Sequence, residues 1–243
     1  MPEVIKYENV SKIYKDKKAV DNINLSIRKG EFLTIIGGSG SGKTTLMKMI
    51  NGLVTPDEGR VLVHGQDIKD TDVIELRKKI GYAIQGNVLF PHMTVEENIS
   101  YVPKLLKMSK EEINDIVNKN LEMVDLPLDI RKRYPSELSG GQVQRVGIAR
   151  SYASSPDILL MDEPFGAVDA ITRYQLQREM KKIHKQTGIT IVLITHDILE
   201  ALKLGTKVLV MDNGIAQQFG TPEDIKERPA TPFVKDLVEM GLL

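Results

Sequence analysis

The chain has 243 residues, 41% hydrophobic and 27% charged, as expected of a globular protein that is soluble on its own. Its 33 Lys and Arg balance 33 Asp and Glu, so the basic excess of a nucleic-acid surface is missing and no nucleic-acid partner is expected. Cysteine is absent, which excludes a disulfide framework and a thiolate metal site. No signal peptide and no apolar run approaching the roughly 20 residues of a membrane span is found.

Residues 1–30 alternate apolar and polar side chains, which predicts strands with one solvent-facing side. A strand, a glycine-rich loop and a helix are expected in "EFLTIIGGSGSGKTTLMKMING", and a turn with a half-exposed strand in "PDEGRVLVHGQDI". From about Val95 to Tyr152 the spacing is helical, and Ser109 followed by Glu111 and Glu112 predicts a helix start.

Three apolar strands are predicted next, in "DILLMDE", "TIVLITH" and "KVLVMDNG". The segment "ITRYQLQREMKKIHKQTG" between the first two predicts a helix that ends at Gly188. "DNG" signals a hairpin turn, and short helices are expected in the tail. Strands that alternate with helices imply an α/β fold with a parallel sheet covered by helices on both sides.

The residues 37–44 match G-x-x-x-x-G-K-[S/T] between a strand and a helix, the context that identifies a phosphate loop. Gly38, Gly40 and Gly42 allow a tight backbone whose N–H groups point inward. Lys43 would reach the β- and γ-phosphates, and the Thr44 hydroxyl would bind Mg²⁺. The alternative is a flexible loop with an incidental lysine. The expected nucleotide-binding residues here are Gly37, Gly38, Ser39, Gly40, Ser41, Gly42, Lys43, Thr44 and Thr45.

Polar residues follow the apolar strands at the edge where ligands bind in open α/β sheets. Asp162 would bind the metal, and Glu163 would orient or deprotonate a water, unless it is a solvated strand end. His196 would contact phosphate or water, although a lone histidine is usually structural. Gln85 could touch both Mg²⁺ and a water, and Tyr14 could stack on a purine or be a half-buried strand tyrosine.

A second anion-binding pattern occurs about a hundred residues after the first. "LSGGQVQR", beginning at Leu138, is a polar turn with two glycines that opens into a helix. Such a helix start presents bare backbone N–H groups to an anion.

Together, "VSKIY", "GGSGSGKT", "IQGNVLFPHMTVEEN", "LSGGQ", "ILLMDEP", "FGAVD" and "THD" resemble the ATP-binding cassette subunit of ABC transporters over essentially the whole chain. The resemblance implies a phosphate-loop NTPase core with an antiparallel β subdomain and an inserted helical subdomain. We expect one domain over residues 1–243, with core and β subdomain at about 1–90 and 155–243 and the helical subdomain at about 91–154. Gly38 stands where proline is frequent in the family, and Val143 where a polar residue is common.

The resemblance also implies roles for the site residues. Tyr14 is similar to the adenine-stacking aromatic, Gln85 to the Q-loop glutamine, Glu163 to the catalytic base and His196 to the γ-phosphate histidine. Two copies of such subunits pack head to tail, so that each nucleotide lies between one phosphate loop and the other copy's signature loop. Ser139, Gly140, Gly141 and Gln142 fall in the signature loop, and Asp169 at the D-loop position against the opposite subunit.

As the family implies, permease subunits would dock near residues 85–98 at the cytoplasmic face of the membrane, and a substrate-binding protein would act indirectly. The segments "LFPHMTVEENISYVPKLLKMSKEEI" and "MDEPFGAVDAITR" look most like importers of glycine betaine, choline and carnitine, with polar amino-acid importers as the alternative. Many members of that group carry a further C-terminal regulatory domain, for which 243 residues leave no room, so a short form or a truncated chain is expected.

Three other classes are less compatible with these residues. A phosphate-loop kinase has no use for "LSGGQ". A DNA-repair relative needs a long coiled-coil insertion, and a ribosome-associated relative typically has two cassettes in one chain.

Overall fold

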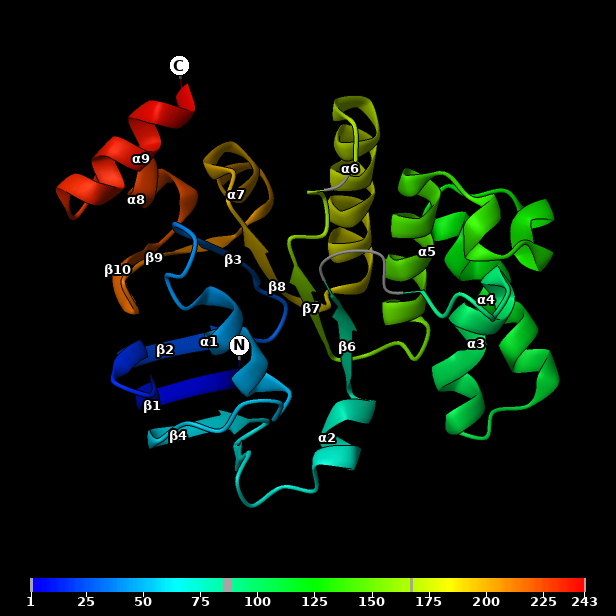
Figure 1. The fold of residues 1–243 in the computed structure, drawn as a ribbon, viewed down its shortest axis with the longest axis horizontal. Helices are drawn as coiled ribbons and strands as arrows, with labels where there is room; N and C mark the ends of the chain where they lie inside the picture. The colour runs from blue at the N-terminus through cyan, green and yellow to red at the C-terminus, as the bar shows by residue number, and fades with distance from the viewer. Residues whose placement is uncertain (1, 85–88, 167, 243) are drawn as a thin grey trace. The chain divides into compact units, whose positions relative to one another are not determined.

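The computed structural model describes residues 2–84, 89–166 and 168–242, and Figure 1 follows its elements along the chain from blue to red. Contacts divide the chain into two compact units. Unit 1 consists of Met1–Arg77 and Gly188–Leu243, and unit 2 of Lys78–Thr187.

Unit 1 contains most of the strands. They are β1 (Glu3–Tyr14), β2 (Lys17–Arg28), β3 (Phe32–Ile36), β4 (Glu58–Val63), β5 (Gln66–Asp67), β8 (Thr190–Thr195), β9 (Lys207–Asp212) and β10 (Ile215–Gly220). Its helices are α1 (Lys43–Ile50), α2 (Val73–Lys78), α7 (Ile198–Leu204), α8 (Pro222–Glu227) and α9 (Pro232–Leu242).

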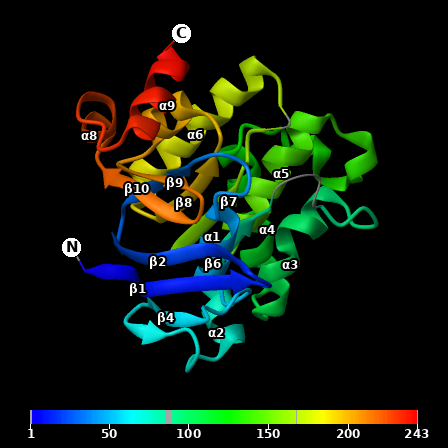
Figure 2. The same ribbon diagram turned by 60° about the vertical axis from the view of Figure 1, so that its left-hand side comes forward.

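An antiparallel sheet in the order β2-β1-β4-β5 forms one layer of unit 1 (Figure 2). In β2, Val20, Ile23, Leu25 and Ile27 are buried and the residues between them are not. From Ile23 to Ile27 burial alternates, because successive side chains of a strand point to opposite faces. The predicted antiparallel β subdomain is therefore confirmed.

The strands β10-β9-β3-β8 form the second sheet of unit 1. Both neighbours of β3 run parallel to it, and β10 is antiparallel to β9. Every residue of β3 and β8 is buried, as expected for strands covered on both faces. The register pairs Ile36 with Thr195, so the residues that follow them, Gly37 and His196, leave the sheet at the same edge.

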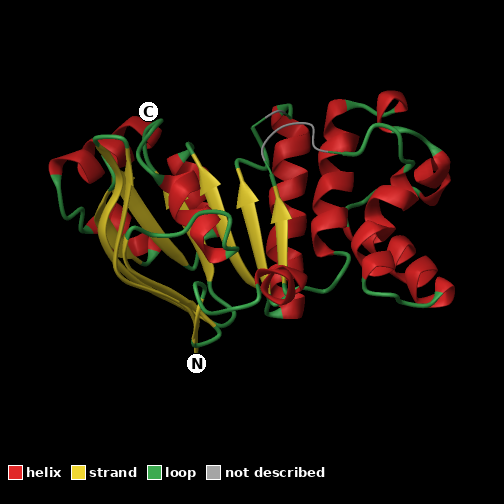
Figure 3. Cartoon of the chain, turned by 60° about the horizontal axis from the view of Figure 1, so that its bottom comes forward, coloured by secondary structure: helices red, strands yellow, loops and turns green. Residues whose placement is uncertain are grey.

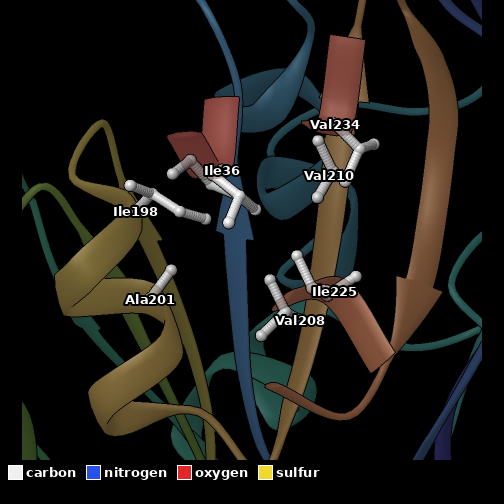
Figure 4. Close-up of a cluster of buried hydrophobic side chains, with 8 residues drawn as sticks. Ile36, Ile198, Ala201, Val208, Val210, Ile225 and Val234 are labelled. Atoms are coloured by element: carbon white, nitrogen blue, oxygen red, sulfur yellow. The ribbon is translucent and has the colours of Figure 1, made fainter. Parts of the chain in front are cut away.

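The helices α7, α8 and α9 pack against β3 and β9 of this sheet (Figure 4). Their buried side chains meet those of β3 and β9 in one apolar cluster, which we call the C-terminal cluster. It consists of Ile36, Ile198, Ala201, Val208, Val210, Ile225, Val234 and Val238.

Unit 2 contains two parallel strands and mainly helices (Figure 3). The strands are β6 (Ile80–Ala83) and β7 (Ile158–Asp162), and the helices are α3 (Val95–Leu105), α4 (Lys110–Met123), α5 (Gly140–Tyr152) and α6 (Ala170–Thr187). Short 3₁₀ segments occupy Leu128–Lys132 and Pro135–Glu137. Ser109 caps α4 in a capping box with Glu112, and Gly188 follows α6 with φ 64°, which confirms both predicted helix ends.

Candidate functional site

The phosphate loop connects β3 to α1 in unit 1, and two of its glycines lie against backbone. A Cβ atom on Gly42 would lie 2.1 Å from the carbonyl oxygen of Ala19, and one on Gly37 would lie 2.0 Å from that of Met211. Gly42 also has φ 97°, in the region that favours glycine. The loop therefore has room only for glycine at these two positions.

Lys43 begins α1 and is buried. Its Nζ donates hydrogen bonds to the carbonyl oxygens of Gly37 and Gly38, both at 2.8 Å, and to Ser41 Oγ at 3.3 Å. The Lys43 side chain thus folds back so that its ammonium group contacts the phosphate loop. Phosphate oxygens could replace these acceptors, because an ammonium group is a compact donor with three N–H bonds.

The start of α1 has no side-chain cap, since its N-cap residue is Gly42. The first N–H groups of a helix have no partner within it, and together with the helix dipole they favour an anion. Thr44 and Thr45 lie in this first turn and are partly exposed. Residues of these types at this place fit phosphate and Mg²⁺, which prefers oxygen ligands.

His196 directly follows β8 in unit 1 and is exposed. Because of the β3–β8 register, it lies at the edge of the sheet from which the phosphate loop starts. Tyr14 is the last residue of β1, where 48% of it is exposed, and Lys12 Nζ lies 5.4 Å from its ring centroid. The same hairpin brings the Ala19 carbonyl to Gly42.

In unit 2, the buried strand β7 ends at Asp162, which is 5% exposed. Glu163 comes next, partly exposed and with φ 46°. A non-glycine residue adopts this conformation rarely, and such strain concentrates at functional sites. The strand end therefore places a buried aspartate and a partly exposed glutamate in succession.

Tyr82 of β6 lies near the Asp162 carboxylate and was not identified as a candidate from the sequence. The register pairs it with Leu160, so its side chain lies on the same face of the strand pair as that of Asp162. Its buried hydroxyl has no hydrogen-bond partner within the part of the chain that the structure describes. Burial, together with the negative charge of Asp162, raises the pKa of Tyr82 to about 12.

The signature loop forms the start of α5 in unit 2. Ser139 Oγ accepts a hydrogen bond from Gln142 N at 3.3 Å, and Gln142 Oε1 accepts one from Ser139 N at 2.9 Å, a capping box. The hydroxyl hydrogen of Ser139 remains able to donate, and the N–H groups of Gly140 and Gly141 have no partner within the helix. A Cβ on Gly141 would lie 3.0 Å from Thr172 Cγ2 of α6.

Asp169 caps that neighbouring helix. Its Oδ1 accepts hydrogen bonds from the backbone N–H groups of Thr172 and Ile171, each at 3.0 Å. Hydrogen bonds from Thr172 and Ile171 hold the pKa of Asp169 below its usual value. Unit 2 thus places the signature loop and the D-loop aspartate at the starts of two helices in contact. Val143 is buried, so this apolar residue packs inward and leaves the start of α5 unchanged.

Gln85 lies outside the described residues. Within the ranges that are described, no helix is long and apolar enough to cross a membrane, and no three His, Cys, Asp or Glu residues group as a metal site. Mg²⁺ bound with a nucleotide needs only one or two carboxylates besides phosphate and water.

The comparisons with known proteins agree with this arrangement. A family profile described as ABC transporter matches residues 20–166. The choline transport ATP-binding protein OpuBA of Bacillus subtilis is 52% identical over 95% of this chain and 61% of its own length. The glycine betaine uptake system ATP-binding protein YehX of Escherichia coli is 48% identical over 96% of this chain and 75% of its own.

Solved structures agree as well. The dimeric structure of a bacterial ABC transporter cassette matches with a TM-score of 0.82 at 37% identity, over 90% of this chain and 98% of that one. The same cassette is also known in a dimeric post-hydrolysis state bound to ADP and Pi, with a TM-score of 0.81. The present chain spans about three fifths of the length of the first relatives it matches. With its fold, its phosphate loop and half of its residues in common with such proteins, the chain belongs to the ABC transporter family.

Proposed function

We propose that this chain is the ATP-hydrolysing subunit of an ABC importer for osmoprotectants such as glycine betaine, choline or carnitine. The observation that carries the ATPase proposal is the phosphate loop, in which Gly37 and Gly42 leave no room for a side chain and Lys43 lies within reach. The substrate class is supported by relatives named for choline, carnitine and glycine betaine transport at 48–52% identity.

The nucleotide would be bound by the phosphate loop and by Tyr14. Residues 37–45 would hold the phosphates through backbone N–H groups and Lys43 Nζ, which would exchange its loop carbonyls for phosphate oxygens. Stacking on the exposed Tyr14 ring would hold the adenine. Thr44, Asp162 and Gln85 would hold Mg²⁺, which neutralises charge on the phosphates when it is bound.

Hydrolysis requires a water in line with the γ-phosphate and a group that accepts its proton. Glu163 is proposed as that base, because the residue is partly exposed and directly follows the buried Asp162. As the water attacks phosphorus, its proton would pass to Glu163 and the bond to the ADP oxygen would break. His196 and Lys43 would donate hydrogen bonds to the charge that develops on the γ-phosphoryl oxygens.

The signature loop is proposed to serve the nucleotide of a second copy in a head-to-tail homodimer. Ser139, Gly140, Gly141 and Gln142 would close on the γ-phosphate, and Asp169 would contact the opposite copy. Neutral donors of this kind bind an anion weakly, so closure would depend on the triphosphate and would be reversed by hydrolysis. The dimer would drive permease subunits at the cytoplasmic face of the membrane. A substrate-binding protein would deliver the transported molecule to these permease subunits.

Three variants test the ATPase and the shared site. Glu163→Gln should bind ATP, hydrolyse it far more slowly and accumulate as a nucleotide-bound dimer in size-exclusion chromatography with light scattering. Hydrolysis at the parent rate would contradict the assignment of the base. A mixture of Ser139→Arg with Lys43→Ala should exceed the activity of either alone, because one site of each mixed dimer then has an intact phosphate loop and an intact signature loop. Activity no higher than that of the parents would reject sharing between copies.

Uptake in cells tests the substrate class. After deletion of the gene, restoring the wild-type chain, but not Glu163→Gln, should restore uptake of labelled glycine betaine, choline or carnitine at high osmolarity. Relatives named for spermidine and putrescine import are 44–45% identical. Restored uptake of spermidine alone would therefore replace the osmoprotectant proposal.

A further inference from the structure

The turn that carries His196 is fixed on both sides. Before it, Thr195 ends β8, and its Oγ1 accepts a hydrogen bond from Asp197 N at 3.0 Å. After it, Asp197 Oδ1 accepts hydrogen bonds from Leu199 N at 2.9 Å and Glu200 N at 3.2 Å, which caps α7. Only Asp197 separates His196 from Ile198, the first residue of α7. The position of the imidazole therefore depends on where α7 begins.

Ile198 anchors this helix start in the C-terminal cluster, where it is 4% exposed. Figure 4 shows its side chain directed toward Ile36, the residue that precedes the phosphate loop. Val234 and Val238 of α9 belong to the same cluster. The last helix of the described chain thus packs on residues adjacent to two parts of the proposed nucleotide site.

Gly241 of α9 lies directly against the start of α7. A Cβ atom there would lie 2.0 Å from Cγ2 of Ile198 and 4.0 Å from Cγ of Leu199. Gly241 does not have a positive φ, so a left-handed helix end does not explain the glycine. Glycine within a helix is less favourable than alanine, and the close contact with Ile198 accounts for its presence at this position.

We propose that α9 positions His196, and that Gly241 and Ile198 are the positioning residues. The packed Ile198 side chain fixes the first turn of α7, and through Asp197 it sets the place from which the imidazole reaches the γ-phosphate. Ile198 cannot yield easily, because a branched side chain in a helix strongly prefers one χ1 rotamer and its neighbours fill the cluster. An atom added at Gly241 would therefore displace the start of α7. This inference rests on the proposed role of His196.

The test uses Gly241→Ala in the full chain, with histidine side-chain NMR as a readout that is independent of hydrolysis. The chain has four histidines, so His64, His92 and His184 serve as internal references. We expect the His196 resonances to move while the other three stay. We also expect kcat for ATP to fall by about 10- to 100-fold, the scale of a small misplacement at a reacting centre, with unchanged affinity for ATP.

Two controls separate positioning from general damage. Gly147→Ala adds the same methyl group to a helical glycine that has no atom within 4 Å of the added position, and Met240→Ala alters the 75% exposed neighbour on α9. Neither should move the His196 resonances. Ile198→Leu has no Cγ2 atom and, combined with Gly241→Ala, should return them toward the wild-type position.

The inference is overturned if the His196 resonances of Gly241→Ala coincide with those of the wild type, or if all four histidines shift alike. Should Gly241→Ala not fold, Val238→Ala loosens the same helix without adding an atom, and its spectrum is judged by the same criteria. Failure of the proposed function is distinguishable: hydrolysis unchanged in His196→Ala would reject the role of His196 whatever the spectra show.

Discussion

The glycines of the phosphate loop form a graded series for substitution by alanine. Gly38 has neither a positive φ nor an atom within 4 Å of the added Cβ. Gly40 has φ 76° but open space, so only its backbone conformation opposes a side chain. Gly42 has φ 97°, and an added Cβ would also lie 2.1 Å from the carbonyl oxygen of Ala19. The three variants therefore separate conformational strain from collision.

The expected changes in the free energy of unfolding follow from these differences. Gly38→Ala should stabilise the nucleotide-free protein by about 0.4–1 kcal/mol, because the unfolded chain loses freedom. Gly40→Ala places a side chain on a residue in the left-handed backbone region, which costs about 1–2 kcal/mol. This variant should therefore be less stable than the wild type. Gly42→Ala adds to the same penalty an overpacking cost of about 1–3 kcal/mol, so a total of about 2–5 kcal/mol is expected.

Urea unfolding without nucleotide measures the series, with the m-value as the check that only stability has changed. An ATP titration of the same variants should rank them in the same order, since the collision at Gly42 displaces the N-cap of α1. Equal midpoints for Gly40→Ala and Gly42→Ala would refute the reasoning, because they would mean that the Ala19 carbonyl does not restrict the loop.

Further predictions concern unit 2. Tyr82→Phe should raise the free energy of unfolding by about 1 kcal/mol, because it removes a buried hydroxyl with no partner among the described residues. Thermal or urea unfolding measures this change, and a loss of stability would indicate that the hydroxyl has a partner. Ser139→Ala should lower the free energy of unfolding by about 1 kcal/mol without nucleotide through loss of the N-cap, and an unchanged value would contradict the capping box. Hydrogen bonds from the backbone N–H and hydroxyl of Thr94 lower the pKa of Glu97, so the stability that they add is present above its unfolded pKa and is lost as pH falls through the folded one. In Thr94→Val the pKa of Glu97, followed by NMR, should rise toward its ordinary value, and an unaltered pKa would exclude the hydroxyl as a cause.

Features set by local rules could be predicted from the sequence. The "DNG" hairpin forms with φ 46° at Asn213 and 80° at Gly214, because these residues tolerate the left-handed region that such turns require. The apolar strands before Gly37, Asp162 and His196 are buried and end where their composition changes. Asp162, Glu163 and His196, the candidates in the described ranges that were expected at strand ends, therefore lie at strand ends.

Features that arise from contacts distant in sequence could not be predicted. Nothing near Gly42 in the sequence indicates that the Ala19 carbonyl faces it, and nothing near Gly241 points to Ile198, 43 positions earlier in the chain. The helix α2 (Val73–Lys78) was not anticipated, since six residues with one buried side chain carry little periodic signal. The buried Tyr82 hydroxyl, which has no partner among the described residues, likewise follows from strand register and packing, and composition does not encode these.

The two anion-binding patterns differ in a way that bears on their proposed division of labour. The helix α1 begins at a glycine without any side-chain cap, with a lysine folded over the loop beside it, so its N–H groups and an ammonium group can bind phosphate within one chain. The helix α5 begins with a closed capping box and no basic residue in its first turn, so it offers a hydroxyl hydrogen and two glycine N–H groups. Without a cation, such donors bind an anion only when other contacts have already brought it there. A strong site and a weak site of this kind fit a dimer in which the first captures ATP and the second closes on a nucleotide that the other copy already holds.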